Sequence, residues 1–227
     1  MKTLKFILVA GLALAASAAA RASTAQAWLE TYYLNPQPEQ LTKNITALSR
    51  EGYFEKQANI ATSIGFISTV FAQNPTRVDG WMSELRGLPE REQRLLAAAL
   101  WQSGHAAGSQ ALRQLSRDSA VRAEVETLAS KPSQTIEDTS VRSSSSMNLK
   151  WGAFLATGNE RHVLSILEAI GTNQPGVDSA ARRSLAYNAA AHPRVLEICR
   201  AQLDRQPAEV QSVLRAALSD AGAQPRS

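Results

Sequence analysis

The polar pentapeptide GNERH, which begins at Gly158, concentrates residue types that often serve in active sites. A hydrolase could use His162 together with Glu160 or Arg161. On a helix, however, Glu160 and His162 would point to different sides, because they are two positions apart. The same residues also fit a helix–turn–helix junction, in which Gly158 ends one helix and Asn159 caps the next. We favour the junction, which leaves Arg161 and His162 facing outward.

The chain has three histidines and one cysteine, and neither type forms a recognisable motif. His105, His162 and His192 are far apart in sequence, whereas zinc ligands usually include a closely spaced pair. Cys199 sits on the apolar face of an expected helix, so we expect a buried, unreactive thiol. Serine-nucleophile and nucleotide-binding motifs are also missing from the sequence. The sequence therefore predicts no catalytic residue, no metal ligand and no cofactor.

An aromatic cluster near the start, Trp28, Tyr32 and Tyr33, is the other unusual feature. Aromatic side chains with a polar tip suit a ligand or protein interface. Alternatively, Trp28 and Tyr32, at positions i and i+4, cap the core of the first helical hairpin. Together with Arg161 and His162, the three aromatic residues form the candidate interaction surface that the sequence offers.

The first 22 residues have the pattern of a cleaved export signal. Lys2 and Lys5 precede an apolar run that is too short to span a bilayer comfortably. Ala20-Arg21-Ala22 then supplies a small-x-small cleavage site before Ser23, and the preceding alanines offer a slightly earlier one. We therefore expect a periplasmic or secreted protein with no transmembrane segment after cleavage.

Removing this signal changes the charge balance. The whole chain carries 24 basic and 20 acidic residues, a formal net charge of +4. Residues 1–22 hold Lys2, Lys5 and Arg21 and no acid, so the mature chain has 21 against 20, or +1. No basic patch with interleaved aromatics remains, so nucleic acid is not an expected partner.

Apolar residues recur at helical spacing almost everywhere. Leu41, Ile45 and Leu48 are one example, and Gly52 provides the stop that follows them. We expect an all-α protein of about ten to twelve short helices, built as stacked helical hairpins in an α-solenoid-like array or an irregular bundle. Several junctions resemble one another, as in a helical repeat, although no diagnostic repeat consensus is met.

A Ser-rich stretch divides the helical pattern. Residues 131–147 are polar and hold few large apolar side chains, which predicts an exposed linker or long loop. It separates an N-terminal helical half, 23–130, from a C-terminal half, 148–227. We expect the two halves to pack together as one domain.

The chain also resembles a family of uncharacterised exported proteins of proteobacteria. The likeness lies in the opening Trp28…Tyr32-Tyr33…Pro36…Pro38-Glu39 and in three segments, LSREGYF (48–54), WGAFLATGNERHV (151–163) and SLAYNAAAHPRV (184–195). This resemblance implies a helical fold, and it implies no activity, cofactor or partner.

The export signal, the helical periodicity and the missing catalytic motifs favour an interaction protein. The expected function is a periplasmic or secreted scaffold that binds a protein or envelope component without catalysis. The alternative is a cell-envelope hydrolase, or a small-ligand-binding protein, with a site that carries no recognisable motif. A deep pocket that joins a histidine with carboxylates would favour the hydrolase.

Overall fold

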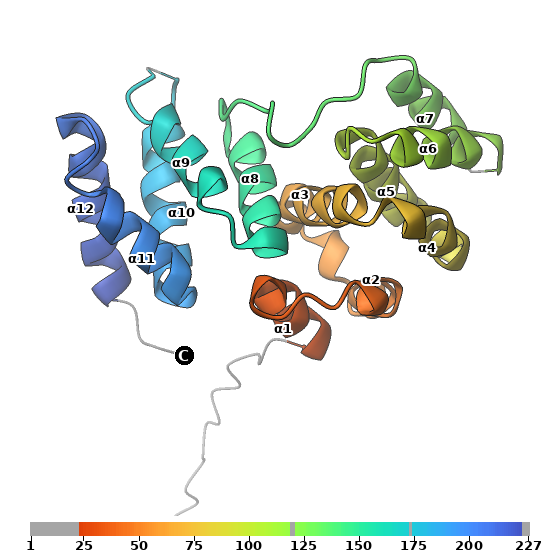
Figure 1. Cartoon of the computed structure of the whole chain (residues 1–227), viewed down its shortest axis with the longest axis horizontal. Helices are drawn as coiled ribbons and strands as arrows, with labels where there is room; N and C mark the ends of the chain where they lie inside the picture. Colours follow the sequence, from red (N-terminus) through yellow and green to blue (C-terminus); the bar gives the residue numbers. More distant parts are fainter. Residues whose placement is uncertain (1–22, 119–120, 173, 224–227) are drawn as a thin grey trace, which may run out of the picture.

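The computed structural model describes residues 23–118, 121–172 and 174–223, which form twelve α-helices and no strand (Figure 1). This confirms the all-α prediction. The helices are α1 (Thr24–Thr31), α2 (Leu41–Arg50), α3 (Gln57–Gln73), α4 (Val78–Glu84), α5 (Glu90–Gln102), α6 (Ala106–Asp118), α7 (Arg122–Ala129), α8 (Ser144–Thr157), α9 (Glu160–Ala169), α10 (Val177–Ala191), α11 (Pro193–Gln202) and α12 (Ala208–Ala223). Residues 1–22 lie outside the described part, so the export signal stays a prediction.

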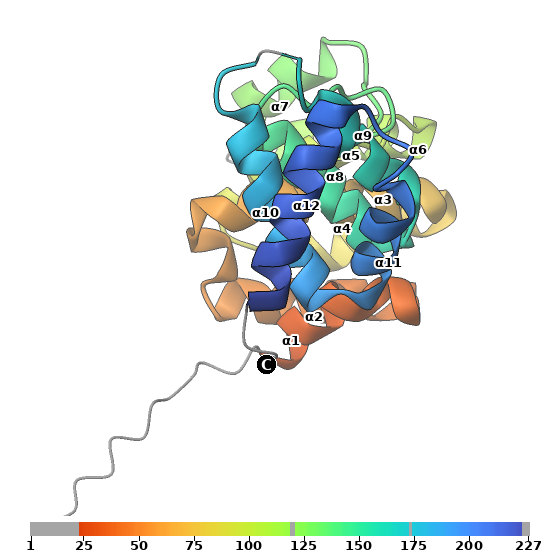
Figure 2. The ribbon, with the colours of Figure 1, turned by 90° about the vertical axis from the view of Figure 1, so that its left-hand side faces the viewer.

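The helices stack in a row across the molecule. Helix α12 packs on α10, α10 on α8, α8 on α3 and α3 on α5 (Figure 1). Helices α9 and α11 pack against α8 and α10 as the second members of helical hairpins. The view along the row places α10, α11 and α12 in front of α8 and α9 (Figure 2). Among the described residues, no helix combines the length and the apolar character needed to cross a bilayer.

The two halves of the chain meet where α3 crosses α8, and two glycines make the close approach possible. A Cβ atom on Gly65 of α3 would collide with the carbonyl oxygen of Leu149 on α8. A Cβ atom on Gly152 of α8 would collide with the carbonyl oxygen of Thr62 on α3. Each helix therefore places a glycine against the backbone of the other, which brings the two helix axes closer than side chains would allow.

The Ser-rich stretch is shorter than the sequence predicts and is not a free linker. Helix α8 begins at Ser144, so the prediction that the loop extends to residue 147 is wrong. The physical reason is a capping box: Ser143 Oγ accepts a hydrogen bond from Ser146 N (3.2 Å), and Ser146 Oγ accepts one from Ser143 N (3.0 Å). Ile136 and Val141 of the same stretch are buried in the protein.

A buried lysine holds this loop in place. Lys150 of α8, only 2% exposed, donates hydrogen bonds from Nζ to the carbonyl oxygens of Ile136 (2.6 Å) and Glu137 (3.1 Å). Burial lowers the pKa of Lys150, and the nearby carboxylates of Glu137, Glu168 and Asp138 oppose that shift. The loop therefore packs against α8 through backbone carbonyls that the ammonium group satisfies.

Two local predictions are confirmed. Gly158 adopts a left-handed conformation (φ 65°) after α8, and the Asn159 side chain accepts a hydrogen bond from Arg161 N (3.0 Å) as the cap of α9. Cys199 is buried in α11, and burial raises the pKa of its thiol to about 12. A thiol with so high a pKa stays protonated and unreactive at neutral pH.

Candidate functional site

The three histidines lie in different parts of the fold. His105 is exposed between α5 and α6, His162 is buried in α9, and His192 lies between α10 and α11. Within the described ranges, no three His, Cys, Asp or Glu side chains come together in a way that could hold a metal ion. The fold therefore does not unite the histidines in one site.

His162 is buried, so the expectation that it faces outward is wrong. It is 4% exposed, and burial lowers its pKa from 6.5 to about 4. Lys150 lowers this pKa further, whereas Glu137 of the loop opposes the shift. The reason for its burial is tertiary, because α9 packs against α8, α10 and α11 with the face that holds His162, Val163 and Ile166. Arg161 is exposed, as the sequence predicts.

The N-terminal aromatic residues form part of the core more than a free surface. The rings of Trp28, Tyr32 and Phe66 lie edge to face, with centroid distances of 5.1 to 5.4 Å. Tyr32 is 2% exposed, so it cannot belong to an interaction surface. Trp28 and Tyr33 are half-buried, and the ring centroids of Tyr33 and Phe154 lie 5.2 Å apart. These contacts match the end-cap interpretation of Trp28 and Tyr32.

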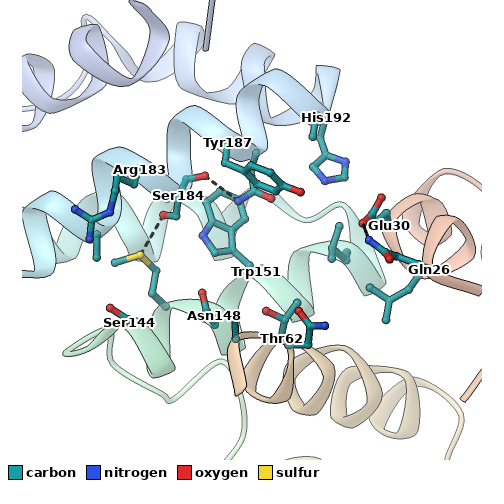
Figure 3. Close-up of a pocket in the computed structure, with 18 of the residues that line it drawn as sticks. Gln26, Glu30, Thr62, Ser144, Asn148, Trp151, Arg183, Ser184, Tyr187 and His192 are labelled. Carbon is teal, nitrogen blue, oxygen red and sulfur yellow. Dashed lines mark hydrogen bonds between the residues drawn. The ribbon is translucent and has the colours of Figure 1, made fainter. Parts of the chain in front are cut away.

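The best candidate site is a cleft between α1, α3, α8 and α10, which we call the central cleft (Figure 3). Its volume is about 440 Å³, within the range typical of ligand pockets. It joins residues from both halves of the chain, because the packing of α3 on α8 and of α8 on α10 brings these helices together. The polar and aromatic residues that line it include Glu30, Asn59, Asn148, Trp151, Arg183, Tyr187, Asn188 and His192.

Several polar groups of the central cleft are free to bind a ligand. The side chains of Asn148 and Arg183 make no hydrogen bond or ion pair to any other described residue. Asn59 Nδ2 donates to Tyr53 O (2.9 Å) and Asn188 Nδ2 to Ser184 O (2.8 Å), which leaves their amide oxygens available. Polar groups that have no internal partner can bond to a ligand without first breaking a protein contact.

The cleft also contains a histidine and a carboxylate. Figure 3 shows His192 and Glu30 at the same end of the cleft. Burial lowers the pKa of His192, and Glu30 opposes that shift, so the imidazole is neutral at pH 7. Glu30 accepts a hydrogen bond from Gln26 Nε2 (2.8 Å). In the described part of the chain, no hydrogen bond links the His192 side chain to a serine, a tyrosine or a carboxylate side chain.

Apart from His192, the polar residues of the central cleft were not predicted from the sequence. They lie on helices far apart in the chain and form no local motif. The available signal was weak: Asn148 and Asn188 each interrupt a mainly apolar helical stretch. Such interruptions are common at helix surfaces, so they do not by themselves indicate a site.

Comparisons of the chain with models of known protein families, with curated protein sequences and with solved structures found no match. The resemblance to a family of exported proteins therefore stays a prediction. The function has to be inferred from the geometry and chemistry of the central cleft.

Proposed function

We propose that this chain is an exported helical scaffold that binds a segment of a partner protein in the central cleft without catalysing a reaction. The observation that carries the proposal is the cleft itself, which four helices from both halves of the chain line, and in which Asn148 of α8 and Arg183 of α10 have no partner among the described residues. Stacked helical hairpins commonly use such concave surfaces for binding.

An exposed aromatic side chain supports a role in binding. Tyr187 of α10 is 61% exposed and is one of the two large hydrophobic residues most open to solvent among those described. It overhangs the central cleft beside Trp151 (Figure 3). Tyrosine is enriched at binding hot spots, because its ring buries a large area and its hydroxyl still forms a hydrogen bond.

The walls of the cleft are rigid elements. The α3–α8 crossing fixes two of its four helices by direct backbone contact at Gly65 and Gly152. A site on packed helices is preorganised, so less conformational entropy is lost when a ligand binds. The hydrolase alternative has Glu30 and His192 in the cleft for proton transfer, and neither is hydrogen-bonded to a nucleophile. The geometry therefore favours binding.

The export part of the proposal makes a first prediction. When the whole chain is produced in a Gram-negative bacterium, we expect it in the periplasmic or culture fraction with Ser23 as its first residue. The charged start, the short apolar run and the small residues that follow are what signal peptidase requires. Mass spectrometry of the intact protein measures the cleavage point. A chain that keeps residues 1–22 and sediments with membranes would contradict export as a cleaved protein.

The binding part makes a second prediction. With a photoreactive benzoylphenylalanine in place of Tyr187, illumination in an envelope extract is expected to give one defined protein adduct. Adding Asn148→Ala to that chain should reduce the adduct about fivefold, because it removes a hydrogen bond worth about 1 kcal/mol. The same photoreactive residue in place of Glu126, exposed on α7 away from the cleft, is the matched control. Equal adducts from both positions, or no effect of Asn148→Ala, would count against the central cleft as the binding site.

A further inference from the structure

The central cleft carries opposite charges at its two ends. Arg183 lies toward one end and Glu30 toward the other, on α10 and α1 respectively (Figure 3). Arg183 is exposed and forms no ion pair within the described residues. Glu30 forms no ion pair with a described residue either, and it accepts a hydrogen bond from the neutral amide of Gln26 (2.8 Å). The two charges are thus separated by the length of the cleft and are available to charges on a ligand.

Three neighbouring helices each contribute one asparagine to the lining of the central cleft. Asn59 comes from α3, Asn148 from α8 and Asn188 from α10, and these helices pack in that order. An asparagine amide offers a donor and an acceptor, the same pair of groups that a peptide unit presents. Amides on successive helices can therefore bond to the alternating N–H and C=O groups of an extended backbone, much as a neighbouring strand would.

An apolar contact lies beside the cationic end. Tyr187 follows Arg183 by four positions on α10, so the two side chains lie on the same face of that helix. Tyr187 is the exposed ring of the cleft, whereas Trp151 forms part of its wall and is only 3% exposed. A side chain of a bound peptide can pack on the tyrosine ring while its neighbour reaches Arg183.

From this arrangement we infer that the ligand of the central cleft is an extended peptide segment with an acidic side chain at Arg183 and a basic side chain at Glu30. The asparagine amides bond to its backbone, and the two charged residues set its orientation. This inference rests on the proposed binding function and adds the chemistry and the charge order of the ligand. It is consistent with the near-neutral mature chain, since recognition needs one charge of each sign and no general basic or acidic surface.

A peptide fits these observations better than an oligosaccharide does. The exposed ring of Tyr187 could stack on a sugar as well as on a peptide side chain, whereas Trp151 is buried, so the preference for a peptide rests on the charges. A neutral glycan gives no role to the two separated charges of Arg183 and Glu30, whereas a peptide with one charge of each sign can pair with both. Binding of a neutral oligosaccharide is therefore an outcome that would overturn the inference.

Fluorescence anisotropy with defined synthetic peptides tests the charge order. The probes are short, labelled peptides with blocked ends and the same mixture of Ala, Ser and Leu inside, and they differ only in their two outer residues. Four pools are compared: two carry Asp at one end and Lys at the other, in opposite orders, one carries Asp at both ends, and one carries Lys at both ends. With the full mature chain, one of the two mixed-charge pools is expected to bind about tenfold more tightly than the like-charge pools, since a charge-assisted pair contributes about 1.5 kcal/mol.

Charge reversal in the protein provides the decisive comparison. Arg183→Glu is expected to shift the preference to the two-Lys pool, and Glu30→Lys to the two-Asp pool. Asn148→Ala is expected to weaken the binding of all pools by a similar factor, because it removes a hydrogen bond to the peptide backbone and leaves the two charged residues in place. Arg200→Glu, the same charge change on the exposed side of α11, is the control and should leave the order of the pools unchanged. Circular dichroism checks that each variant remains helical.

The possible results separate this inference from the proposed function. Equal binding of all pools, with no effect of Arg183→Glu, would overturn the charge order while the cleft remains a peptide site. Binding of a chitin tetrasaccharide in place of every peptide pool would overturn the choice of a peptide ligand. If no probe binds while the photoreactive residue at position 187 still gives its adduct, the inference fails and the scaffold function stands. If neither the peptide pools nor the photoreactive residue gives the expected result, both the peptide inference and the proposed scaffold function are rejected.

Discussion

Replacing Gly152 by alanine is expected to lower the free energy of unfolding by about 3 kcal/mol, a large part of the total stability of a typical domain. The new Cβ atom would collide with the carbonyl oxygen of Thr62 and lie 2.6 Å from the backbone nitrogen of Phe66. These are backbone atoms of α3, so no side-chain rotation can relieve the contact, and the two helices must separate. Urea denaturation followed by circular dichroism measures the loss.

Gly65→Ala is expected to act in the same way, because its Cβ atom would meet the carbonyl oxygen of Leu149 from the other side of the crossing. The double variant should lose less than the sum of the two single losses, since one separation of α3 from α8 relieves both contacts. Gly80→Ala in α4 is the matched control. It has no atom within 4 Å of the added Cβ and should stabilise the helix by up to about 1 kcal/mol. A Gly152→Ala variant as stable as the control would contradict the close backbone contact between α3 and α8.

The second large effect is a loss of stability in acid caused by His162. The folded protein holds the pKa of His162 at about 4, whereas in the unfolded chain it returns to its ordinary value of 6.5. Above pH 6.5 neither state binds the proton, and the full stability is present. Between pH 6.5 and 4 the unfolded state binds a proton that the folded state does not, so stability falls as the pH is lowered. The difference corresponds to about 3 kcal/mol of unfolding free energy by pH 4.

The measurement is a series of urea denaturation curves from pH 7.5 to pH 4. His162→Gln is expected to flatten the pH dependence in this window, because the imidazole no longer titrates. Part of the slope should remain, since burial also lowers the pKa of His192. His105→Gln, at an exposed position, is the control and should leave the slope unchanged. Identical slopes in the wild type and in His162→Gln would contradict the burial of this histidine.

The local features of the fold could be predicted because their causes are local. Helical spacing of apolar residues predicts the all-α class, and the predicted number of helices agrees with the twelve in the described part of the chain. The junction at Gly158 and Asn159 followed from the conformational freedom of glycine and the capping preference of asparagine. The helix start at Ser144 also has a local cause, the Ser143–Ser146 capping box, and the Ser-rich composition of the stretch masked it.

The candidate site could not be predicted, because it depends on which helix faces meet. His162 is buried because α9 packs against α8, α10 and α11 with the face that also holds Ile166 and Ala169. Likewise, no spacing along the chain relates Asn59, Asn148 and Asn188, which share a cleft because α3, α8 and α10 pack in a row.

The sequence by itself determined the helical class, the positions of most turns, the burial of Cys199 and the expectation of export. Hydrophobic periodicity, capping and composition act over a few residues and can be recognised in any short segment. Only the tertiary structure decided how closely α3 approaches α8, which histidine is buried and which polar groups line the central cleft. The physical reason is that helix packing depends on the fit of whole surfaces, and residues distant in sequence supply the two sides of each contact.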